Sequence, residues 1–408
     1  MTAARLHAHT VEVPDPGDLL HRQPEPNALT WVRGGEGLVA WGEALRVDLG
    51  GGEPIERAAE SVRALAERAQ VTDEVGAPGS GLVAFFSGTF DPARSGSLLL
   101  VPRVLLGRSG GRAWVTTVEV EGPPPQPRLG PVHAAADTGR IRYAGSFVDE
   151  LAWLSAVAEA TRRITAGELE KVVLARDLVV WAAAPLDGRI LTRRLAERFP
   201  DCFTFSVDGL IGATPELLMR RRGESVESLV LAGTAARGAD EAEDRRLGDA
   251  LLGSCKDLDE HEHAVASVRD VLAARGAQPA VDGPALLRLA NVQHLATEVR
   301  GRLAGDHSVL DLAAAVHPTA AVCGTPTPDA LRLLRSLEGL DRGRYAGPVG
   351  WVDAAGDGEL GIALRCALVE GTRARLYAGA GVVAGSLPEA ELEETRLKFR
   401  AFQTALAG

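Results

Sequence analysis

The chain has 408 residues, of which 46% are hydrophobic and 24% charged, a composition that supports a large folded core. Its net charge of −11 argues against nucleic acid as the main partner, because phosphate binding needs a basic surface. Four cysteines without a CxxC pair suggest reduced thiols and a cytoplasmic protein rather than a zinc knuckle or disulfide framework. No apolar run reaches the ~18 residues of a membrane helix, so we expect no membrane partner.

Residues 1–140 are predicted to be rich in strands and loops. Short apolar runs at Gly81–Phe86 and Ser97–Leu106 are typical of strands. The Gly122–Pro127 segment contains four prolines and is the best candidate for a linker. We therefore expect one large domain over residues 1–408, in which a variable N-terminal part (1–140) completes the sheets of a catalytic region (145–405).

The pattern changes after Gly145. Ser146–Thr165 is predicted to be an amphipathic helix, Lys171–Trp181 a buried strand, and Asp187–Phe199 a helix capped by Asp187. Because strands come in runs rather than in regular βαβ alternation, the order favours an α+β fold with mixed or antiparallel sheets. Further strands are expected at Cys202–Val207, Leu217–Arg221, Ser225–Leu231, Asn291–Leu303, Arg344–Asp353, Glu359–Glu370 and Arg373–Val383, and further helices from a capping box at Asp240 and Glu243, over Asp257–Arg275 and over Pro388–Leu406.

Two glutamates on predicted helices are candidates for a metal site. Glu262 falls on or beside an apolar stripe, where a carboxylate is costly unless it is paired or holds a metal; a rotated helix would leave it on the surface. Glu394 and Lys398 are four residues apart, which suits an exposed ion pair equally well. His261 and His263 do not suggest zinc, because residues two apart do not share a helix face.

Lys171 and Glu216 are candidates for acid–base chemistry. A lysine at a sheet surface can act as a base when burial lowers its pKa, although a strand-end lysine more often reaches solvent. A carboxyl group on the turn GATPELL (212–218) can be a general acid, or an ordinary turn residue. Glycine-rich segments at 231–234 and 378–381 would let a ligand approach the backbone, or would serve tight strand packing.

Taken together, ten segments resemble the chorismate-utilising enzymes, in the order found in that family. They are EKVVLAR (170–176), GATPELL (212–218), LAGTAARG (231–238), DEHEHAV (259–265), VQHLATEVRG (292–301), HPTAAVCGTP (317–326), YAGPVGWVD (345–353), ALRCALV (363–369), LYAGAGVVAGS (376–386) and EETRLKF (393–399). The resemblance covers about residues 145–405. It implies a sandwich of two packed sheets flanked by helices, like anthranilate synthase component I, with the active site between the sheets.

The resemblance also implies roles for individual residues. Glu262 and Glu394 are expected to bind Mg²⁺, Lys171 to act as general base and Glu216 as general acid. Arg365 is expected to hold a carboxylate of the substrate, and Lys398 to contact the carboxylate bound to the metal. Further contacts to the substrate are expected from Gly233, Thr234, His294, His317, Ala321, Tyr345, Leu364, Gly379, Ala380 and Gly381.

Within this family, a lysine at position 171 is typical of members that use water as nucleophile. The resemblance therefore implies conversion of chorismate to isochorismate, for menaquinone or siderophore synthesis, by a monomer without a glutaminase partner. Ala321 favours this reaction. Tyr345 and Leu364 also occur in members that go on to eliminate pyruvate and form salicylate, which is the alternative. An alternative of another class is a non-catalytic relative that only binds chorismate.

Overall fold

The computed structural model describes residues 5–127, 139–289 and 292–407. In these residues, strands alternate with eight α-helices and one short 3-10 helix, η1 (Leu19–Arg22). The helices are α1 (Pro54–Arg68), α2 (Glu150–Thr165), α3 (Gly188–Arg198), α4 (Glu241–Leu252), α5 (Cys255–Ala274), α6 (Val309–Val316), α7 (Thr327–Leu337) and α8 (Pro388–Ala407). The strands of the N-terminal part are β1 (Leu6–Val13), β2 (Leu29–Arg33), β3 (Glu36–Leu49), β4 (Gln70–Asp73), β5 (Val83–Ser87), β6 (Ser97–Ser109) and β7 (Arg112–Val120).

The remaining strands belong to the C-terminal part of the chain. They are β8 (Ile141–Gly145), β9 (Lys171–Ala182), β10 (Phe203–Val207), β11 (Leu210–Thr214), β12 (Leu217–Arg222), β13 (Ser225–Ala236), β14 (Ala280–Val281), β15 (Ala285–Arg288), β16 (Val292–Arg302), β17 (Gly324–Thr325), β18 (Pro348–Asp353), β19 (Gly358–Ile362), β20 (Cys366–Glu370) and β21 (Arg373–Val383). Most of the predicted helices and strands are therefore present, with boundaries shifted by a few residues.

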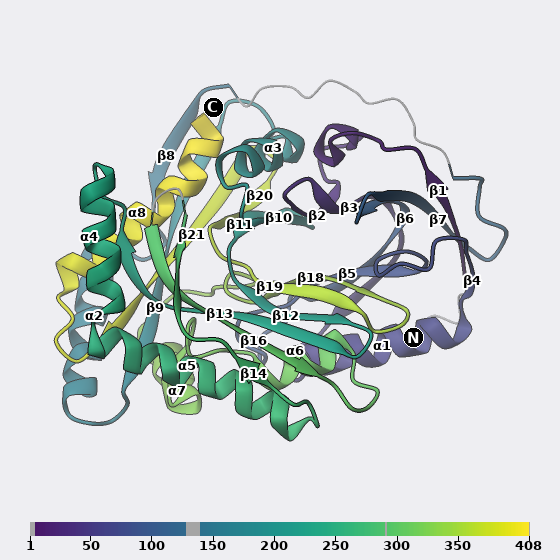
Figure 1. Ribbon diagram of the computed structural model, residues 1–408. Helices are drawn as coiled ribbons and strands as arrows, with labels where there is room; N and C mark the ends of the chain where they lie inside the picture. Colours follow the sequence, from purple (N-terminus) through teal and green to yellow (C-terminus); the bar gives the residue numbers. More distant parts are fainter. Residues whose placement is uncertain (1–4, 128–138, 290–291, 408) are drawn as a thin grey trace.

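The strands form two sheets that are joined by the pairing of the long strands β3 and β6. One sheet runs from β3 through β2, β10, β11, β20 and β21 to β9. The other runs from β6 through β5, β18, β19, β12 and β13 to β16. Among the described residues, all pairings are antiparallel except that of β1 with β4. Figure 1 shows the two sheets side by side, joined near β3 and β6. The predicted α+β class is confirmed.

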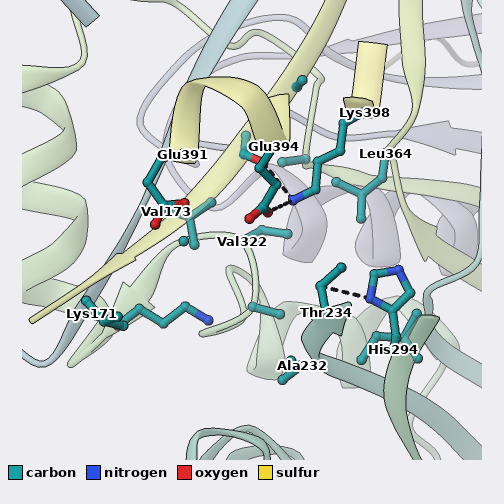
Figure 2. A pocket seen from close by; sticks show the side chains of 18 of the residues that line it. Lys171, Val173, Ala232, Thr234, His294, Val322, Leu364, Glu391, Glu394 and Lys398 are labelled. Atoms are coloured by element: carbon teal, nitrogen blue, oxygen red, sulfur yellow. Dashed lines mark hydrogen bonds and ion pairs between the residues drawn. The ribbon is translucent and has the colours of Figure 1, made fainter. Parts of the chain in front are cut away.

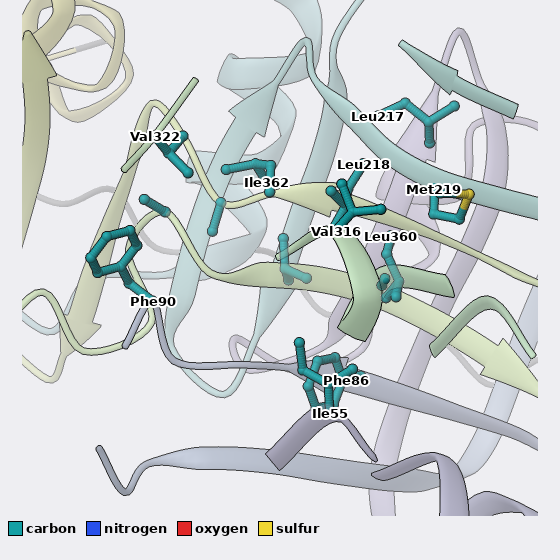
Figure 3. Packing of buried hydrophobic residues seen from close by; sticks show 14 of the residues in the cluster. Ile55, Phe86, Phe90, Leu217, Leu218, Met219, Val316, Val322, Leu360 and Ile362 are labelled. Carbon is teal, nitrogen blue, oxygen red and sulfur yellow. The ribbon is translucent and has the colours of Figure 1, made fainter. Parts of the chain in front are cut away.

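Helices cover the outer faces of both sheets. Helix α8 packs on β21, with α2 and α3 beside it, while α5 packs on β13 and β16 and α6 on β12. Apolar side chains fill the space between helices and strands because their burial is the main favourable contribution to folding. Figure 3 shows this packing around Phe86 of β5, Leu360 of β19 and Ile55 of α1, all of them buried.

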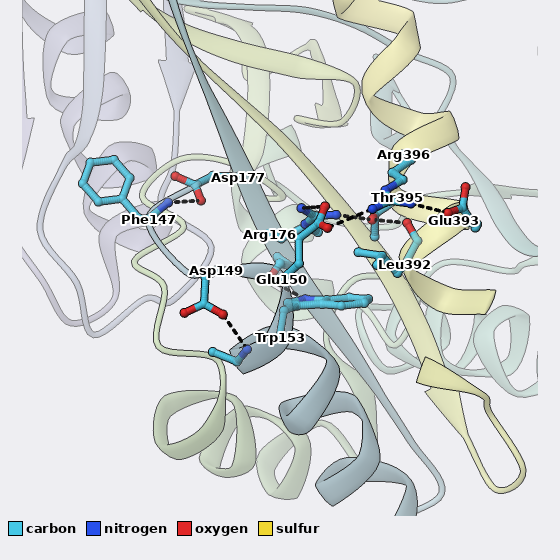
Figure 4. Close-up of polar contacts among 12 residues, drawn as sticks. Phe147, Asp149, Glu150, Trp153, Arg176, Asp177, Leu392, Glu393, Thr395 and Arg396 are labelled. Carbon is cyan, nitrogen blue, oxygen red and sulfur yellow. Dashed lines mark hydrogen bonds and ion pairs between the residues drawn. The ribbon is translucent and has the colours of Figure 1, made fainter. Parts of the chain in front are cut away.

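A buried arginine joins the outer helices to β9. Arg176 donates to Glu150 of α2 over 2.9 Å and to the hydroxyl of Thr395 of α8 over 3.4 Å. Its guanidinium lies over the ring of Trp153, whose indole nitrogen donates to the carbonyl of Ala175. Figure 4 shows how these contacts converge on β9. These contacts fix β9, which begins with the candidate base Lys171, against α8, which carries the candidate metal ligand Glu394.

One predicted strand is divided in two. The sequence pattern predicts a single strand over Glu359–Glu370, but the chain leaves the sheet between β19 and β20. At this break Arg365 has φ +48°, in the left-handed region that costs free energy for a residue with a Cβ. Strand β11 was not predicted. At the start of α4, Asp240 accepts from the Glu243 N–H, but Glu243 accepts from Ala239, so the capping box is incomplete.

Candidate active site

A cavity of about 470 Å³ lies where the two sheets diverge. Strands β9 and β21 form one wall, and β13, β16 and the turn before β12 form the other. Figure 2 shows Lys171 and Val173 of β9 facing Thr234 and His294 across the cavity, with α8 above them. The volume is in the range of cavities that bind small molecules. Most of the predicted site residues lie together here.

Lys171, the first residue of β9, points into this cavity. Its Nζ donates to the Glu260 carboxylate over 2.5 Å, and its side chain is only 11% exposed. Gly381 on the neighbouring strand leaves room for it, since a Cβ at that position would lie 3.1 Å from Lys171 Cε. The lysine side chain therefore lies between Gly381 of β21 and the Glu260 carboxylate of α5.

The prediction of Glu262 as a cavity carboxylate is wrong, and Glu260 takes that place. Glu262 is exposed and does not line the cavity, whereas Glu260 and Asp257 do. Residues two apart point to different sides of a helix, so only one of the two glutamates can face the cavity. The buried face of α5 is centred on His261, Val265 and neighbouring apolar residues, which turns Glu260 inward and Glu262 to solvent. The burial of His261, between the two glutamates, shows how the helix is rotated about its axis.

Helix α8 contributes a second pair of carboxylates. Glu391 and Glu394, three residues apart, both line the cavity, as does Lys398. Lys398 donates to Glu394 over 2.6 Å and to the carbonyl of Gly379 over 2.8 Å, so it links α8 to β21 (Figure 2). The pair is partly shielded from solvent, unlike the exposed pair that the sequence alone would allow.

Glu216 lies on the turn between β11 and β12, with 6% of its surface exposed. Burial raises the pKa of its carboxyl group to about 8, although the positive charges of Lys171 and Arg365 act in the opposite direction. This pKa favours the protonated form at neutral pH. A buried, protonated carboxyl group within the electrostatic reach of a lysine is suited to donate a proton.

Arg365 and His294 are hydrogen-bonded in the wall of the cavity. The Arg365 guanidinium donates to His294 Nε2 over 3.0 Å, and His294 Nδ1 lies 3.0 Å from the Thr234 hydroxyl. Because an arginine can only donate, Nε2 must accept and Nδ1 carries the hydrogen. Burial and the charges of Arg365 and Lys398 lower the pKa of His294 to about 3. The histidine is neutral and the arginine provides the local positive charge.

The two glycine-rich segments, 231–234 and 378–381, were predicted to let a ligand approach the backbone, and both reach the cavity. Gly379 and Gly381 line the cavity, but Ala380 between them does not; its side chain is buried in the core because side chains alternate across a strand. At Gly379 a Cβ would lie 3.2 Å from the Tyr345 hydroxyl. Gly233 has φ +79° and sits where the pairing of β13 and β16 shifts by one residue. The shift brings this backbone to the cavity.

Tyr345, Leu364 and Ala321 also line the cavity, as predicted from the resemblance. Tyr345 stacks on Tyr377 with ring centroids 5.1 Å apart. His317 does not line the cavity; its Nε2 lies 3.0 Å from the carbonyl of Phe90, and burial lowers its pKa to about 4. The prediction of His317 as a pocket residue is therefore corrected to a structural contact with the N-terminal part.

Several lining residues were not predicted. Besides Asp257, Glu260 and Glu391, these include Tyr377 and Arg342. Arg342 is buried, pairs with Glu338, and donates to the carbonyl of Val322 over 2.9 Å. Asp257, three residues before Glu260, and Glu391, three before Glu394, could have been found from helical spacing. The arginine is recognisable only from its place in the fold.

The carboxylates of α5 and α8 form a donor set that suits a hard divalent cation. Asp257 and Glu260 face the cavity from one helix, and Glu391 and Glu394 face it from the other. Among the described residues there is no compact group of three or more His, Cys, Asp or Glu side chains for a metal. Magnesium needs only one or two protein carboxylates, because it keeps several waters and binds oxygen atoms of its substrate. The residues present fit such an ion.

Comparison with known proteins agrees with this geometry. A family model described as chorismate binding enzyme matches residues 133–407. Isochorismate synthase DhbC of Bacillus subtilis is 44% identical over 269 residues, which span 61% of this chain and 66% of that protein, just under two thirds of its length.

Two solved structures show the same fold. The menaquinone-specific isochorismate synthase MenF of Escherichia coli is 26% identical with a TM-score of 0.80, over 98% of this chain and 94% of that one. Anthranilate synthase component I of Streptococcus pneumoniae is 21% identical with a TM-score of 0.73, over 91% and 92%. These structures confirm the predicted fold, and the match to the family model shows that the chain belongs to the chorismate binding enzymes.

Proposed function

We propose that this protein is an isochorismate synthase, which adds water to C2 of chorismate and removes the C4 hydroxyl group. The observation that carries the proposal is that a partly buried lysine, Lys171, and a buried glutamic acid with a raised pKa, Glu216, line one cavity. A water-dependent exchange of hydroxyl groups needs one base and one acid, and a protein that only binds chorismate would need neither.

In the proposed reaction Lys171 takes a proton from a water molecule. The water oxygen forms a bond to C2, the two ring double bonds shift, and the C4–O bond breaks. Glu216 gives its proton to the departing hydroxyl group, which leaves as water. Lys171 contacts Glu260 over 2.5 Å, and this contact holds the side chain of the proposed base in the cavity.

The substrate carries two carboxylates, and the cavity offers separate positive groups for them. Arg365 donates a hydrogen bond to His294, which is neutral and adds no positive charge of its own. A guanidinium binds a carboxylate through two parallel hydrogen bonds, which suits the enolpyruvyl carboxylate. Lys398, anchored on Gly379 and Glu394, lies near the α8 carboxylates and is suited to the ring carboxylate.

We propose that Glu260 and Glu394, with Asp257 and Glu391 beside them, hold Mg²⁺. When bound, the ion would supply positive charge for the ring carboxylate and for negative charge that develops in the reaction. The protein residues contribute orientation: each helix presents two carboxylates three residues apart toward the same cavity.

The cellular setting stays a prediction. None of the helices in the described part of the chain is long and apolar enough to cross a membrane. We propose a cytoplasmic protein, which its four free cysteines support. Lys171, as a residue for water chemistry, supports a reaction that needs no glutaminase partner, and a monomer remains our prediction. The pathway that receives the product, menaquinone or siderophore synthesis, is known only for the relatives.

The test is incubation of the purified protein with chorismate and Mg²⁺, without ammonia, followed by chromatography. Isochorismate in equilibrium with chorismate, and no pyruvate, is the expected result. Salicylate and pyruvate in equal amounts would replace the proposal by a salicylate synthase, the reaction that Tyr345 and Leu364 allow. Consumption of chorismate only after ammonia is added would show that the assignment of Lys171 to water is wrong. Binding without turnover would support a non-catalytic relative.

A further inference from the structure

His261 lies beside Glu260 on α5 and is 2% exposed. Its Nδ1 is 3.2 Å from the carbonyl oxygen of Ala232 on β13, and its Nε2 is 2.7 Å from the hydroxyl oxygen of Thr297 on β16. A carbonyl oxygen only accepts, so Nδ1 must carry the hydrogen and Nε2 accepts from the threonine. Both ring nitrogens are therefore used in bonds to the sheet.

These bonds attach α5 to the wall of the cavity. Ala232 lines the cavity and immediately precedes Gly233, where the pairing of β13 with β16 shifts. Glu260 directly precedes His261 on the helix, and its carboxylate is 2.5 Å from Lys171 Nζ. Asp257 is one turn earlier, on the side of α5 that lines the cavity. A rotation or slide of α5 would move both carboxylates relative to α8.

We propose that His261 is a positioning residue for the divalent cation, acting through Glu260 and Asp257 without touching the ion itself. It is not a ligand, because it does not line the cavity and both nitrogens are engaged with the sheet. The bond to Ala232 is the important one, since Ala232 itself lines the cavity, whereas Thr297 does not. The inference rests on the proposed function only for the presence of a cation at these carboxylates.

The experiment measures binding of Mn²⁺ by electron paramagnetic resonance, with Mg²⁺ as competitor and no chorismate present. His261→Leu should weaken binding by about 10- to 100-fold, the usual effect of removing a group that orients a metal ligand. His261→Asn places an amide nitrogen near the position of Nδ1 and should bind within a few-fold of the unchanged protein. His261→Gln, whose amide lies one carbon further, should not restore the affinity.

Matched variants on the same helix separate positioning from general loss of stability. Val268→Ala removes buried volume from α5 and should lower the thermal unfolding temperature while leaving the Mn²⁺ affinity unchanged. Glu262→Gln, on the exposed side, should change neither. If His261→Leu does not fold, the difference between the Asn and Gln variants carries the test.

Three results would overturn the inference. They are unchanged affinity in a folded His261→Leu or His261→Gln variant, an equal loss of affinity in Val268→Ala, and no cation binding by the unchanged protein. An unchanged protein that binds Mn²⁺ but leaves chorismate intact would instead overturn the proposed function. In that case the comparison among the variants would still decide the role of His261.

Discussion

Lys171 and Glu260 are in direct contact at the wall of the cavity, where Nζ of the lysine lies 2.5 Å from a carboxylate oxygen of the glutamate. The contact joins the first residue of β9 to α5, so the candidate base and a candidate metal ligand are coupled directly. A change at either residue should therefore affect both proton transfer and the cation.

Glu260→Gln should abolish most of the activity, whereas Glu262→Gln should leave it within about twofold. The first change removes a cavity carboxylate and the acceptor of the Lys171 ammonium group, and we expect kcat to fall by about 10²-fold or more. The second change affects an exposed side chain. Steady-state rates with chorismate over a range of Mg²⁺ concentrations measure both effects. Equal losses in the two variants would contradict the assignment of Glu260.

The rate of the forward reaction should fall as the pH rises above about 8. Burial raises the pKa of Glu216 to about 8, and only its protonated form can donate to the departing hydroxyl group. Glu216→Gln keeps the shape but has no acidic proton, so kcat should drop by about 10²- to 10⁴-fold. A pH profile of kcat for the unchanged protein, with the ionic strength held constant, measures the descending limb. A rate that keeps rising through pH 9 would argue against Glu216 as the acid.

Glu216 should also make the stability of the protein depend on pH. Its folded-state pKa, about 8, lies above the ordinary value of 4.5. Its contribution to the free energy of unfolding is therefore fully present below pH 4.5 and is lost as the pH rises through about 8. Denaturant unfolding at several pH values should show less loss of stability between these limits in Glu216→Gln than in the unchanged protein. Identical pH dependences would mean that Glu216 is not protonated in the folded state.

Arg365→Lys should raise the KM for chorismate by about 10- to 100-fold, with a smaller change in kcat. Lysine keeps the charge but loses the two parallel hydrogen bonds of a guanidinium, and a hydrogen bond to a charged group contributes about 1.5–3 kcal/mol. The backbone at this position has φ +48°, which both residues must adopt equally. Steady-state kinetics separate the two constants. A loss confined to kcat would place Arg365 in the chemical step instead.

Gly381→Ala should lower kcat by displacing the base. The added methyl group would lie 3.1 Å from Lys171 Cε, so that side chain must shift by a few tenths of an ångström. Gly283→Ala is the control, because a Cβ there meets no atom within 4 Å and its φ is not in the left-handed region. Thermal unfolding of both variants tells a local displacement from a loss of folding. Normal kinetics in Gly381→Ala would show that the lysine has more freedom than the packing indicates.

Local patterns were sufficient for most elements because each has a strong period or a clear cap. Helix α3 begins after Asp187, whose carboxylate accepts from Arg189 N–H, as the capping pattern predicts. Strand β9 is rich in β-branched and other apolar residues, with Arg176 and Asp177 between two apolar runs. The break before Arg365 was missed because Glu359–Glu370 has no glycine or proline at that point, and the strained backbone is maintained by contacts from other strands, such as that of Ala213 N–H with the Arg365 carbonyl.

The candidate site was predictable where a residue type is tied to a motif, as for Lys171, Glu216 and Arg365. It was not predictable where the choice depends on the rotation of a helix. Glu260 and Glu262 are both acidic and both adjacent to His261, and the packing of His261 between β13 and β16 decides which carboxylate faces inward. Ala380 and His317 were similarly misplaced because strand alternation and a distant carbonyl, that of Phe90, determine their surroundings.

Strands β2 and β5 of the N-terminal part pair with β10 and β18 of the catalytic region. A fragment that begins near residue 140 would therefore leave one edge of β10 and one edge of β18 without a partner strand, and such edges recruit other chains. Expression of the catalytic region alone should yield aggregates rather than a smaller enzyme. Tolerance of sequence change in the first 140 residues should accordingly be high at loops and low along these two strands.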